Sequence, residues 1–308
     1  MMKNFNELIK MAKNEARPMT VAVVSAHDEH TLEAISSACK DGFITPVLIG
    51  DKEKIKELID THGFQLNNTE IINEKDDAAA AKKAVSMIRG KTADFLMKGK
   101  LQTTVLLREV VNRETGLSRG RLMSHFGIFE LPCYHKLLAL TDGGMLPRPD
   151  ADEKARILMN AVDTLHCLGY KDPKVAVLAA SEDVNPKIPE SADGAALKKM
   201  NKDGRIKGCV VEGPMSFDLM FSKEAAAVKG YESTVTGNAD ILLMPDMTSG
   251  NLLAKAFQFT AGAKMAGMIV GASVPIVLVS RGATAEEKHL SLILSAAVSR
   301  RKEIPDEL

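Results

Sequence analysis

A hydroxyl, a guanidinium, a glycine and a carboxylate stand close together near the end of the chain, at Ser280, Arg281, Gly282 and Glu287. A hydroxyl donates a hydrogen bond, a guanidinium binds an oxyanion through paired N–H groups, and a carboxylate accepts a proton. The set therefore suits proton transfer beside an anionic substrate. The plainer alternative is a turn, a solvated charge and a helix cap.

The elements that must position these groups can be predicted from the residues around them. Residues 276–279 are β-branched or leucine and follow Pro275, which predicts a short buried strand. Thr284 and Glu287 stand three apart before an apolar run with helical spacing, so a helix with a capping box should begin there. Open α/β sheets bind their ligands at such strand-to-helix junctions.

A second set of cations follows the strand predicted at 93–97 and leads into another predicted helix. Its members are Lys98, Gly99, Lys100, Thr103, Thr104 and Arg108. A helix amino terminus with flanking cations predicts an anion-binding site, with Thr103 or Thr104 as the helix cap. A cap surrounded by solvated charges is the alternative.

Two later strands, predicted at 206–211 and 239–244, are each followed by small, polar, glycine- and proline-containing segments, EGPMS and PDMTSGN. Loops at the ends of neighbouring parallel strands share one edge of a sheet, so we expect a common ligand cleft. The candidate binding residues of the second loop are Asp246, Ser249 and Asn251. The Asn251 amide could bond substrate or only its own turn.

Strand and helix patterns alternate along the chain at a spacing of about 25 residues, which is typical of βαβ units on a parallel sheet. The chain has 308 residues, enough for two domains of about 150 each. Pro147 and Pro149 follow a predicted strand and a glycine pair, and we expect a domain boundary there. The predicted fold class is α/β, with two domains of mostly parallel sheets flanked by helices.

Composition narrows the classes of partner. Lysine plus arginine equals aspartate plus glutamate, 40 against 40, and tryptophan is absent, so neither nucleic acid nor a membrane surface is an expected partner. The longest apolar stretch, 266–279, is interrupted by glycine and proline and is shorter than the ~20 residues of a membrane helix. Four scattered cysteines argue against a disulfide framework and fit a reducing cytoplasm.

The chain resembles the phosphate acetyltransferase and phosphate butyryltransferase family. The matching segments are MKGKLQT at 97–103, SHFGIFE at 124–130, LTD with a following proline at 140–147, IKGCVVEGP at 206–214, ADILLMPDMTSGN at 239–251 and VLVSRG at 277–282. They follow the family order over nearly the whole chain. The length, the MKG segment and KGCVVEGP bring the chain nearer to the butyryl branch.

This resemblance implies a reversible reaction in which acyl-CoA and inorganic phosphate give acyl phosphate and CoA, with butyryl favoured and acetyl as the alternative. CoA is then a substrate or product, no cofactor stays bound, no metal takes part, and a homodimer or higher homo-oligomer is expected. The implied fold is that of the isocitrate and isopropylmalate dehydrogenases, with a cleft between two domains. The domains would be 1–142 with 267–308, and 143–266.

The resemblance also implies roles for the candidate residues. Arg108 would clamp phosphate and Arg281 would add positive charge for phosphate or CoA. Ser280 would donate a hydrogen bond to the thiolate sulfur. Glu287 would be the general base on the CoA thiol in the reverse direction, but the butyryl branch places its acidic residue at Glu286, so the base stays open between the two.

Two other functions are alternatives to acyl transfer. A metal- and NAD-dependent decarboxylating dehydrogenase of the same fold needs aspartates one helical turn apart, whereas Asp246 has Leu242 and Gly250 at those distances. A catalytically degenerate CoA-binding protein stays open, because a glutamate stands where the acetyl enzymes carry an aspartate.

Overall fold

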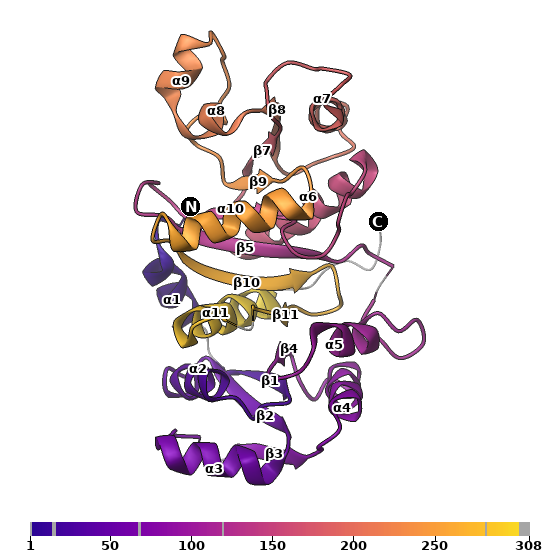
Figure 1. Cartoon of the computed structure of the whole chain (residues 1–308), viewed down its shortest axis with the longest axis vertical. Coiled ribbons are helices and arrows are strands. Elements are labelled where there is room, and N and C mark those ends of the chain that lie inside the picture. Colours follow the sequence, from indigo (N-terminus) through magenta and orange to yellow (C-terminus); the bar gives the residue numbers. More distant parts are fainter. Residues whose placement is uncertain (1, 14–16, 67–68, 119, 281, 302–308) are drawn as a thin grey trace. The chain divides into compact units, whose positions relative to one another are not determined.

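The computed structural model describes residues 2–13, 17–66, 69–118, 120–280 and 282–301, so Arg281 lies outside the described residues. The chain folds as two compact units, coloured along the sequence in Figure 1. The first unit is Asn4–Arg121 with Met265–Leu308, and the second is Met1–Lys3 with Leu122–Lys264. The chain thus changes unit after Arg121 and Lys264, whereas the sequence predicts changes after 142 and 266.

The first unit carries a largely parallel sheet in the order β3-β2-β1-β4-β11-β10. Its strands are β1 (Met19–Val24), β2 (Ile44–Gly50), β3 (Glu70–Asn73), β4 (Phe95–Lys98), β10 (Lys264–Val270) and β11 (Ile276–Val277). Its helices are α1 (Phe5–Lys13), α2 (Glu29–Lys40), α3 (Lys52–His62), α4 (Asp77–Arg89), α5 (Thr103–Val110) and α11 (Ala285–Arg301). Strand β10 pairs antiparallel with β11, whereas β11 pairs in parallel with β4.

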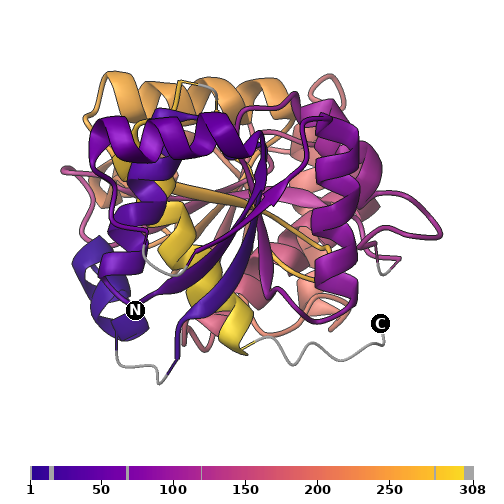
Figure 2. The ribbon, with the colours of Figure 1, turned by 90° about the horizontal axis from the view of Figure 1, so that it is seen from below.

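Helices cover both faces of this sheet, as Figure 2 shows. Helix α11 packs on α2 and contacts β11, β4 and β1, while α4 packs on α5 and contacts β1, β2 and β4. Because β1, β4 and β11 are parallel neighbours, the segments that follow them emerge at one edge of the sheet. The packing of the first unit therefore places the residues after Val24, Lys98 and Val277 together.

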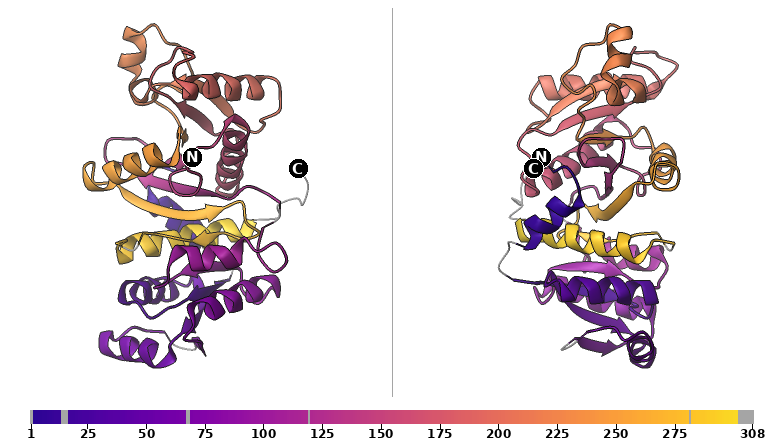
Figure 3. Two further views of the ribbon diagram at one scale, coloured as in Figure 1. Left: turned by 45° about the vertical axis from the view of Figure 1, so that its right-hand side comes forward. Right: turned by 90° about the vertical axis from the view of Figure 1, so that its left-hand side faces the viewer.

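The second unit carries a sheet in the order β5-β6-β9-β7-β8, surrounded by its own helices (Figure 3). Its strands are β5 (Ser124–Glu130), β6 (Leu138–Thr141), β7 (Lys174–Leu178), β8 (Val210–Met215) and β9 (Ile241–Leu243). Its helices are α6 (Ala151–Cys167), α7 (Pro189–Lys202), α8 (Phe217–Phe221), α9 (Lys223–Val228) and α10 (Met247–Phe259). The strands and helices of the two units confirm an α/β fold with mostly parallel strands flanked by helices.

Strand β5 explains why the unit changes earlier than the sequence predicts. Strand β5 begins at Ser124 and pairs antiparallel with β6. Strand β6 in turn pairs in parallel with β9, so the β5–β6 hairpin belongs with the later strands. The strand opens with a serine and a histidine, which are weak strand signals, and Ser124 is nonetheless fully buried.

In the second unit, a segment that contains glycine and proline lies inside a strand and not in the predicted loop. The segment Glu212-Gly213-Pro214, predicted as a loop, lies inside β8. A side chain at Gly213 would place its Cβ 2.7 Å from Val177 Cβ, and one at Gly194 would lie 2.7 Å from Pro214 Cα. The small residues therefore allow β8 to pack closely on β7 and α7, and do not end the strand.

Two helix ends in the second unit are set by local capping and turn residues. Helices α8 and α9 are separated at Ser222, whose hydroxyl accepts from Ala225 N at 3.1 Å and caps α9. Helix α10 ends at Phe259, and β10 follows. Gly262 has a φ of +63°, a left-handed turn that glycine adopts without strain.

None of the helices in the described ranges combines the length and apolar character needed to cross a membrane.

A buried ion pair joins the segments that precede β6 and β9 in the second unit. Lys136 and Asp240 are only 1% and 3% exposed, and Nζ lies 2.6 Å from Oδ1. Lys136 Nζ also donates to Asn238 O, and Asp240 Oδ2 accepts from Lys174 N. Burial lowers the pKa of Lys136, and the hydrogen bond and charge of Asp240 oppose that shift.

Substitution Lys136→Met should therefore leave the buried Asp240 carboxylate without its cation and lower the free energy of unfolding by about 3 kcal/mol or more. The matched control is Lys199→Met, because the Lys199–Asp203 pair is 75% and 49% exposed and such pairs contribute about 1 kcal/mol or less. Urea denaturation of both variants measures the difference. Equal stability of the two would contradict a structural role for the buried pair.

Candidate active site

A cavity of about 350 Å³ lies in the first unit, at the edge where β1, β4 and β11 end. Three cations, Lys98, Lys100 and Lys288, and two carboxylates, Asp28 and Asp77, line it. The remaining lining residues are Gly99, Leu101, Gln102, Val279 and Ser280. The predicted candidates Lys98, Gly99 and Ser280 thus share one hollow, although they come from distant parts of the sequence.

Backbone hydrogen bonds hold the segment after β4 against the segment after β1. Gly99 N donates to Val24 O and Lys100 N donates to Ser25 O, both at 2.8 Å. A Cβ on Gly99 would lie 2.4 Å from Ser25 O, so only glycine fits this contact. The contact fixes where Lys98 and Lys100 leave the backbone.

Ser25 links the same place to helix α4. Its φ is +52°, in the left-handed region that non-glycine residues adopt rarely, and its hydroxyl donates to Asp77 Oδ1 at 2.5 Å. Asp77 is the first residue of α4 and lines the cavity. The hydrogen bond therefore fixes one carboxylate in the cavity wall.

Lys98 brings a buried cation to the cavity. Its side chain is 6% exposed, and Nζ donates to Gly99 O at 3.2 Å. The next helix, α5, has Gln102 at its N-cap with no side-chain capping bond, so the prediction that Thr103 or Thr104 caps the helix is wrong. Both threonines are instead the first helical residues, because the backbone turns into α5 immediately after the β4–β1 contact.

The start of α11 follows the predicted capping pattern. Thr284 Oγ1 accepts from Glu287 N at 3.1 Å, which confirms Thr284 as the cap. Glu287 is 9% exposed and Glu286 is exposed, and neither belongs to the cavity lining. Gly282 is exposed with open space around it.

Arg108 lies farther along α5 and is exposed. It follows Gln102, the N-cap residue in the cavity wall, by six positions, or about 9 Å along a helix that rises about 1.5 Å per residue. Helical side chains lean toward the amino terminus. Arg108 is not among the residues that line the cavity, although it lies on the helix that begins at the cavity wall.

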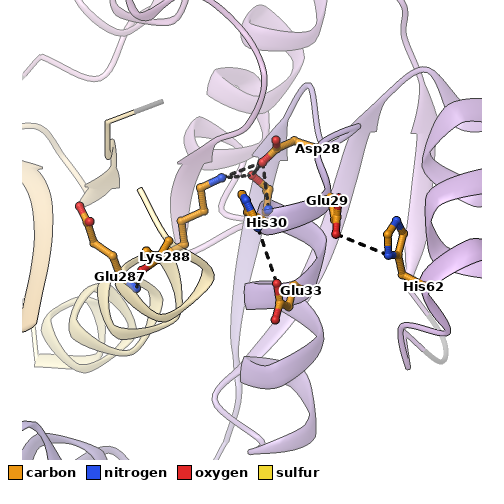
Figure 4. A network of polar contacts seen from close by, with 9 residues as sticks. Asp28, Glu29, His30, Glu33, His62, Glu287 and Lys288 are labelled. Carbon is orange, nitrogen blue, oxygen red and sulfur yellow. Dashed lines mark hydrogen bonds and ion pairs between the residues drawn. The ribbon is translucent and has the colours of Figure 1, made fainter. Parts of the chain in front are cut away.

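Lys288 extends from α11 to the start of α2, as Figure 4 shows, whereas Glu287 points to another side of α11. Lys288 Nζ lies 2.7 Å from Asp28 Oδ2 and donates to Thr31 Oγ1 at 3.0 Å. Burial raises the pKa of the Asp28 carboxyl, but hydrogen bonds from Lys288 and Thr31 outweigh burial and hold that pKa below its ordinary value. Asp28 is thus an ionised carboxylate at neutral pH.

The sequence reasoning missed the two residues of this pair. Asp28 carries the same signal as Lys98, a polar residue between a β-branched run and the start of a helix, and could have been found by that rule. Lys288 carries a weaker signal, a cation in the first turn of a helix, where the helix dipole disfavours positive charge.

The other three candidates lie in the second unit. Asp246 caps α10 and accepts from Ser249 N at 2.8 Å, and Ser249 Oγ completes the capping box. Asn251 Nδ2 donates to Gly143 O at 3.4 Å. The segments after β6 and β9 are therefore joined, and the Asn251 amide binds backbone of the second unit.

Asp142 organises this part of the second unit. It is 3% exposed, and its two carboxylate oxygens accept from four backbone N–H groups, those of His125, Gly144, Met145 and Leu146. Burial lowers the pKa of the neighbouring His125, an effect that Asp142 opposes and Lys255 reinforces. His125 is thus neutral at pH 7.

Among the residues that the structure describes, no three histidine, cysteine, aspartate or glutamate side chains gather closely enough to hold a metal ion.

Comparison of the structure with known structures shows that the chain has the fold of a phosphotransacylase. A branched-chain phosphotransacylase from Enterococcus faecalis V583 superimposes with a TM-score of 0.82 at 32% identity, covering 91% of this chain and 99% of that one. A phosphate butyryltransferase from Clostridium acetobutylicum is 42% identical over 302 residues, 98% of this chain and all of that protein. A phosphate acetyltransferase from Thermotoga maritima is 39% identical, covering 94% and 98% of the two chains.

The family described as "Phosphate acetyl/butaryl transferase" matches residues 78–296. The chain belongs to this phosphate acetyl/butyryl transferase family, as its motifs predict.

Substitution Gly99→Ala should displace the β4–α5 segment, because its Cβ would meet backbone oxygens of Ser25 and Val24 at 2.4 and 2.6 Å. We expect a fall in thermal stability of several degrees, since a rigid backbone clash of this kind costs about 1–3 kcal/mol. The control for stability is Gly282→Ala, whose Cβ would meet no atom within 4 Å. Differential scanning calorimetry that shows equal midpoints would contradict the proposed contact.

His125 should contribute a pH-dependent loss of stability. Its pKa lies below the ordinary 6.5, so below pH 6.5 the unfolded chain binds a proton that the folded chain does not. Stability should therefore decrease from pH 7.5 to 5.5, and less steeply in His125→Gln. The midpoint of thermal unfolding at each pH measures the slope, with exposed His135→Gln as the control. Identical slopes in the wild type and His125→Gln would refute the assignment.

Proposed function

We propose that this protein transfers a short-chain acyl group, with butyryl favoured, from acyl-CoA to inorganic phosphate, giving acyl phosphate and CoA reversibly. The observation that carries the proposal is the match with phosphate acyltransferases over nearly the whole chain. The cavity that brings Ser280 beside three lysines supports it, because the reaction needs cations and a hydroxyl around one anion.

The proposed chemistry begins with a bound phosphate dianion. A phosphate oxygen attacks the thioester carbonyl carbon, the new C–O bond forms, and the C–S bond breaks with its electron pair on sulfur. Lys98 and Lys100 would hold the phosphate against the acyl group, which lowers the entropic part of the barrier. Ser280 would donate a hydrogen bond to the departing thiolate.

Proton transfer to and from the CoA thiol is assigned to the first turn of α11. In the reverse direction the base takes the thiol proton and passes it to the departing phosphate, and in the forward direction it takes the proton of the attacking hydrogen phosphate and gives it to the thiolate. The candidates are Glu287, which is 9% exposed, and Glu286, which is exposed. Separate substitutions to glutamine decide between them, since the base is the residue whose loss removes the fall in the rate of the reverse reaction at acid pH.

The other candidates take supporting roles in the proposal. Arg108 would contact the part of the substrate that extends along α5, and Arg281 would add positive charge. Binding roles are also proposed for Gly99, Thr103, Gly282, Asp246, Ser249 and Asn251. CoA would act as substrate and product with no bound cofactor, in a cytoplasmic homodimer or larger homo-oligomer with the dehydrogenase-like arrangement that the resemblance implies.

A phosphate acetyltransferase is the second candidate function, and the acetyl-transferring relative at 39% identity favours it. Release of CoA, followed with a thiol reagent, should be compared for acetyl-, propionyl-, butyryl- and branched acyl-CoA at fixed phosphate. We expect the highest kcat/KM with butyryl-CoA. A higher value with acetyl-CoA would assign the second function, and no CoA release with any acyl group would reject both.

Substitutions Ser280→Ala and Arg108→Ala should each lower kcat/KM by about 100-fold or more, the scale of losing one preorganised stabiliser. The controls are Ser86→Ala on the exposed side of α4 and Arg205→Ala in a solvent-exposed pair. Turnover near the wild-type value in both test variants would remove these residues from the proposed site.

A further inference from the structure

We propose that Lys288 binds a phosphoryl group of the substrate in the cavity, and that Asp28 is the residue that positions its ammonium group. This inference rests on the proposed function and adds a binding residue to it. It is carried by the burial of Lys288, by its hydrogen bonds and by its place in the cavity wall.

The Lys288 ammonium group has two hydrogen-bond partners in the protein and three N–H donors. Lys288 is 6% exposed, and its Nζ contacts Asp28 Oδ2 at 2.7 Å and Thr31 Oγ1 at 3.0 Å. A lysine ammonium has three N–H donors, so these two partners leave one. Because Lys288 lines the cavity, the remaining donor is available to an anion within it.

The charges around the cavity favour an anion. Its wall contains three lysines and two aspartates, a balance of one positive charge. Both aspartates are occupied by donors, Asp28 by Lys288 and Thr31 and Asp77 by Ser25. A phosphoryl dianion would therefore meet Lys98, Lys100 and Lys288 beside carboxylates that already accept hydrogen bonds from the protein.

Helix stability does not account for a lysine at this position. Lys288 stands in the first turns of α11, where the partial positive charge of the helix terminus disfavours a cation. Its ammonium also lies at the start of α2, a second helix amino terminus. Two helix termini and one ammonium therefore meet at this place, where Asp28 is the carboxylate that contacts the ammonium.

The phosphoryl group could belong to inorganic phosphate or to CoA, and the two sources make different predictions. If it is inorganic phosphate, loss of Lys288 raises the KM for phosphate and leaves the KM for CoA nearly unchanged. If it is the 3′-phosphate of CoA, the KM for CoA rises, and dephospho-CoA, which lacks that group, binds the wild type and the variant equally.

The test uses Lys288→Met, Lys288→Arg and the double variant Asp28→Asn/Lys288→Met, which leaves no buried carboxylate unpaired. We expect Lys288→Met and the double variant to raise one of the two KM values by about 10-fold or more, with a smaller effect on kcat. Lys288→Arg should restore that KM to within about 3-fold, because it keeps the charge. Lys82→Met, on the exposed side of α4, is the control.

Thermal midpoints of all variants separate binding from folding. A purely structural tie between α2 and α11 would lower the midpoint in Lys288→Met and leave both KM values as in the wild type, which overturns the inference. Calorimetric titration with inorganic phosphate and with CoA provides a readout that does not need turnover. If the wild type fails to transfer acyl groups, the proposed function falls, and weaker binding by Lys288→Met then still decides the inference.

Discussion

The candidate site depends on one close backbone contact, in which the segment after β4 crosses the end of β1. Gly99 N and Lys100 N donate to Val24 O and Ser25 O, and no side chain fits at Gly99. This contact sets the direction of Lys98 and Lys100 and the start of α5. Without it, the cations would be solvated charges on a loop, and a phosphate ion would have no fixed partners.

The second constraint is the packing of α11 on α2, two helices that are some 250 residues apart in the chain but neighbours in the first unit. It brings Lys288 to Asp28 and Ser280 to the cavity that the β4 segment lines. A cation is thereby held inside the fold by a carboxylate that also caps α2. Asp28 thus both caps α2 and fixes the position of a cation in the cavity wall.

Prediction of the elements succeeded where the residues carry strong local signals and failed where tertiary contacts outweigh them. The β-branched residues of β11 and the capping pattern of Thr284 and Glu287 at the start of α11 are such signals. In β8, by contrast, Gly213 and Pro214 mark close packing inside a strand. In β5, a buried serine begins a strand that is held by its antiparallel pairing with β6.

The sequence by itself determined the α/β class, the family and several residues that line the cavity, because strand-ending glycines, hydroxyls and cations are local patterns. Only the tertiary structure decided that Lys288 and Asp28 meet, that Ser280 shares a cavity with Lys98, and that Glu287 lies outside its wall. The reason is physical. Side-chain direction on a helix and the approach of distant segments follow from packing, which no single stretch of sequence specifies.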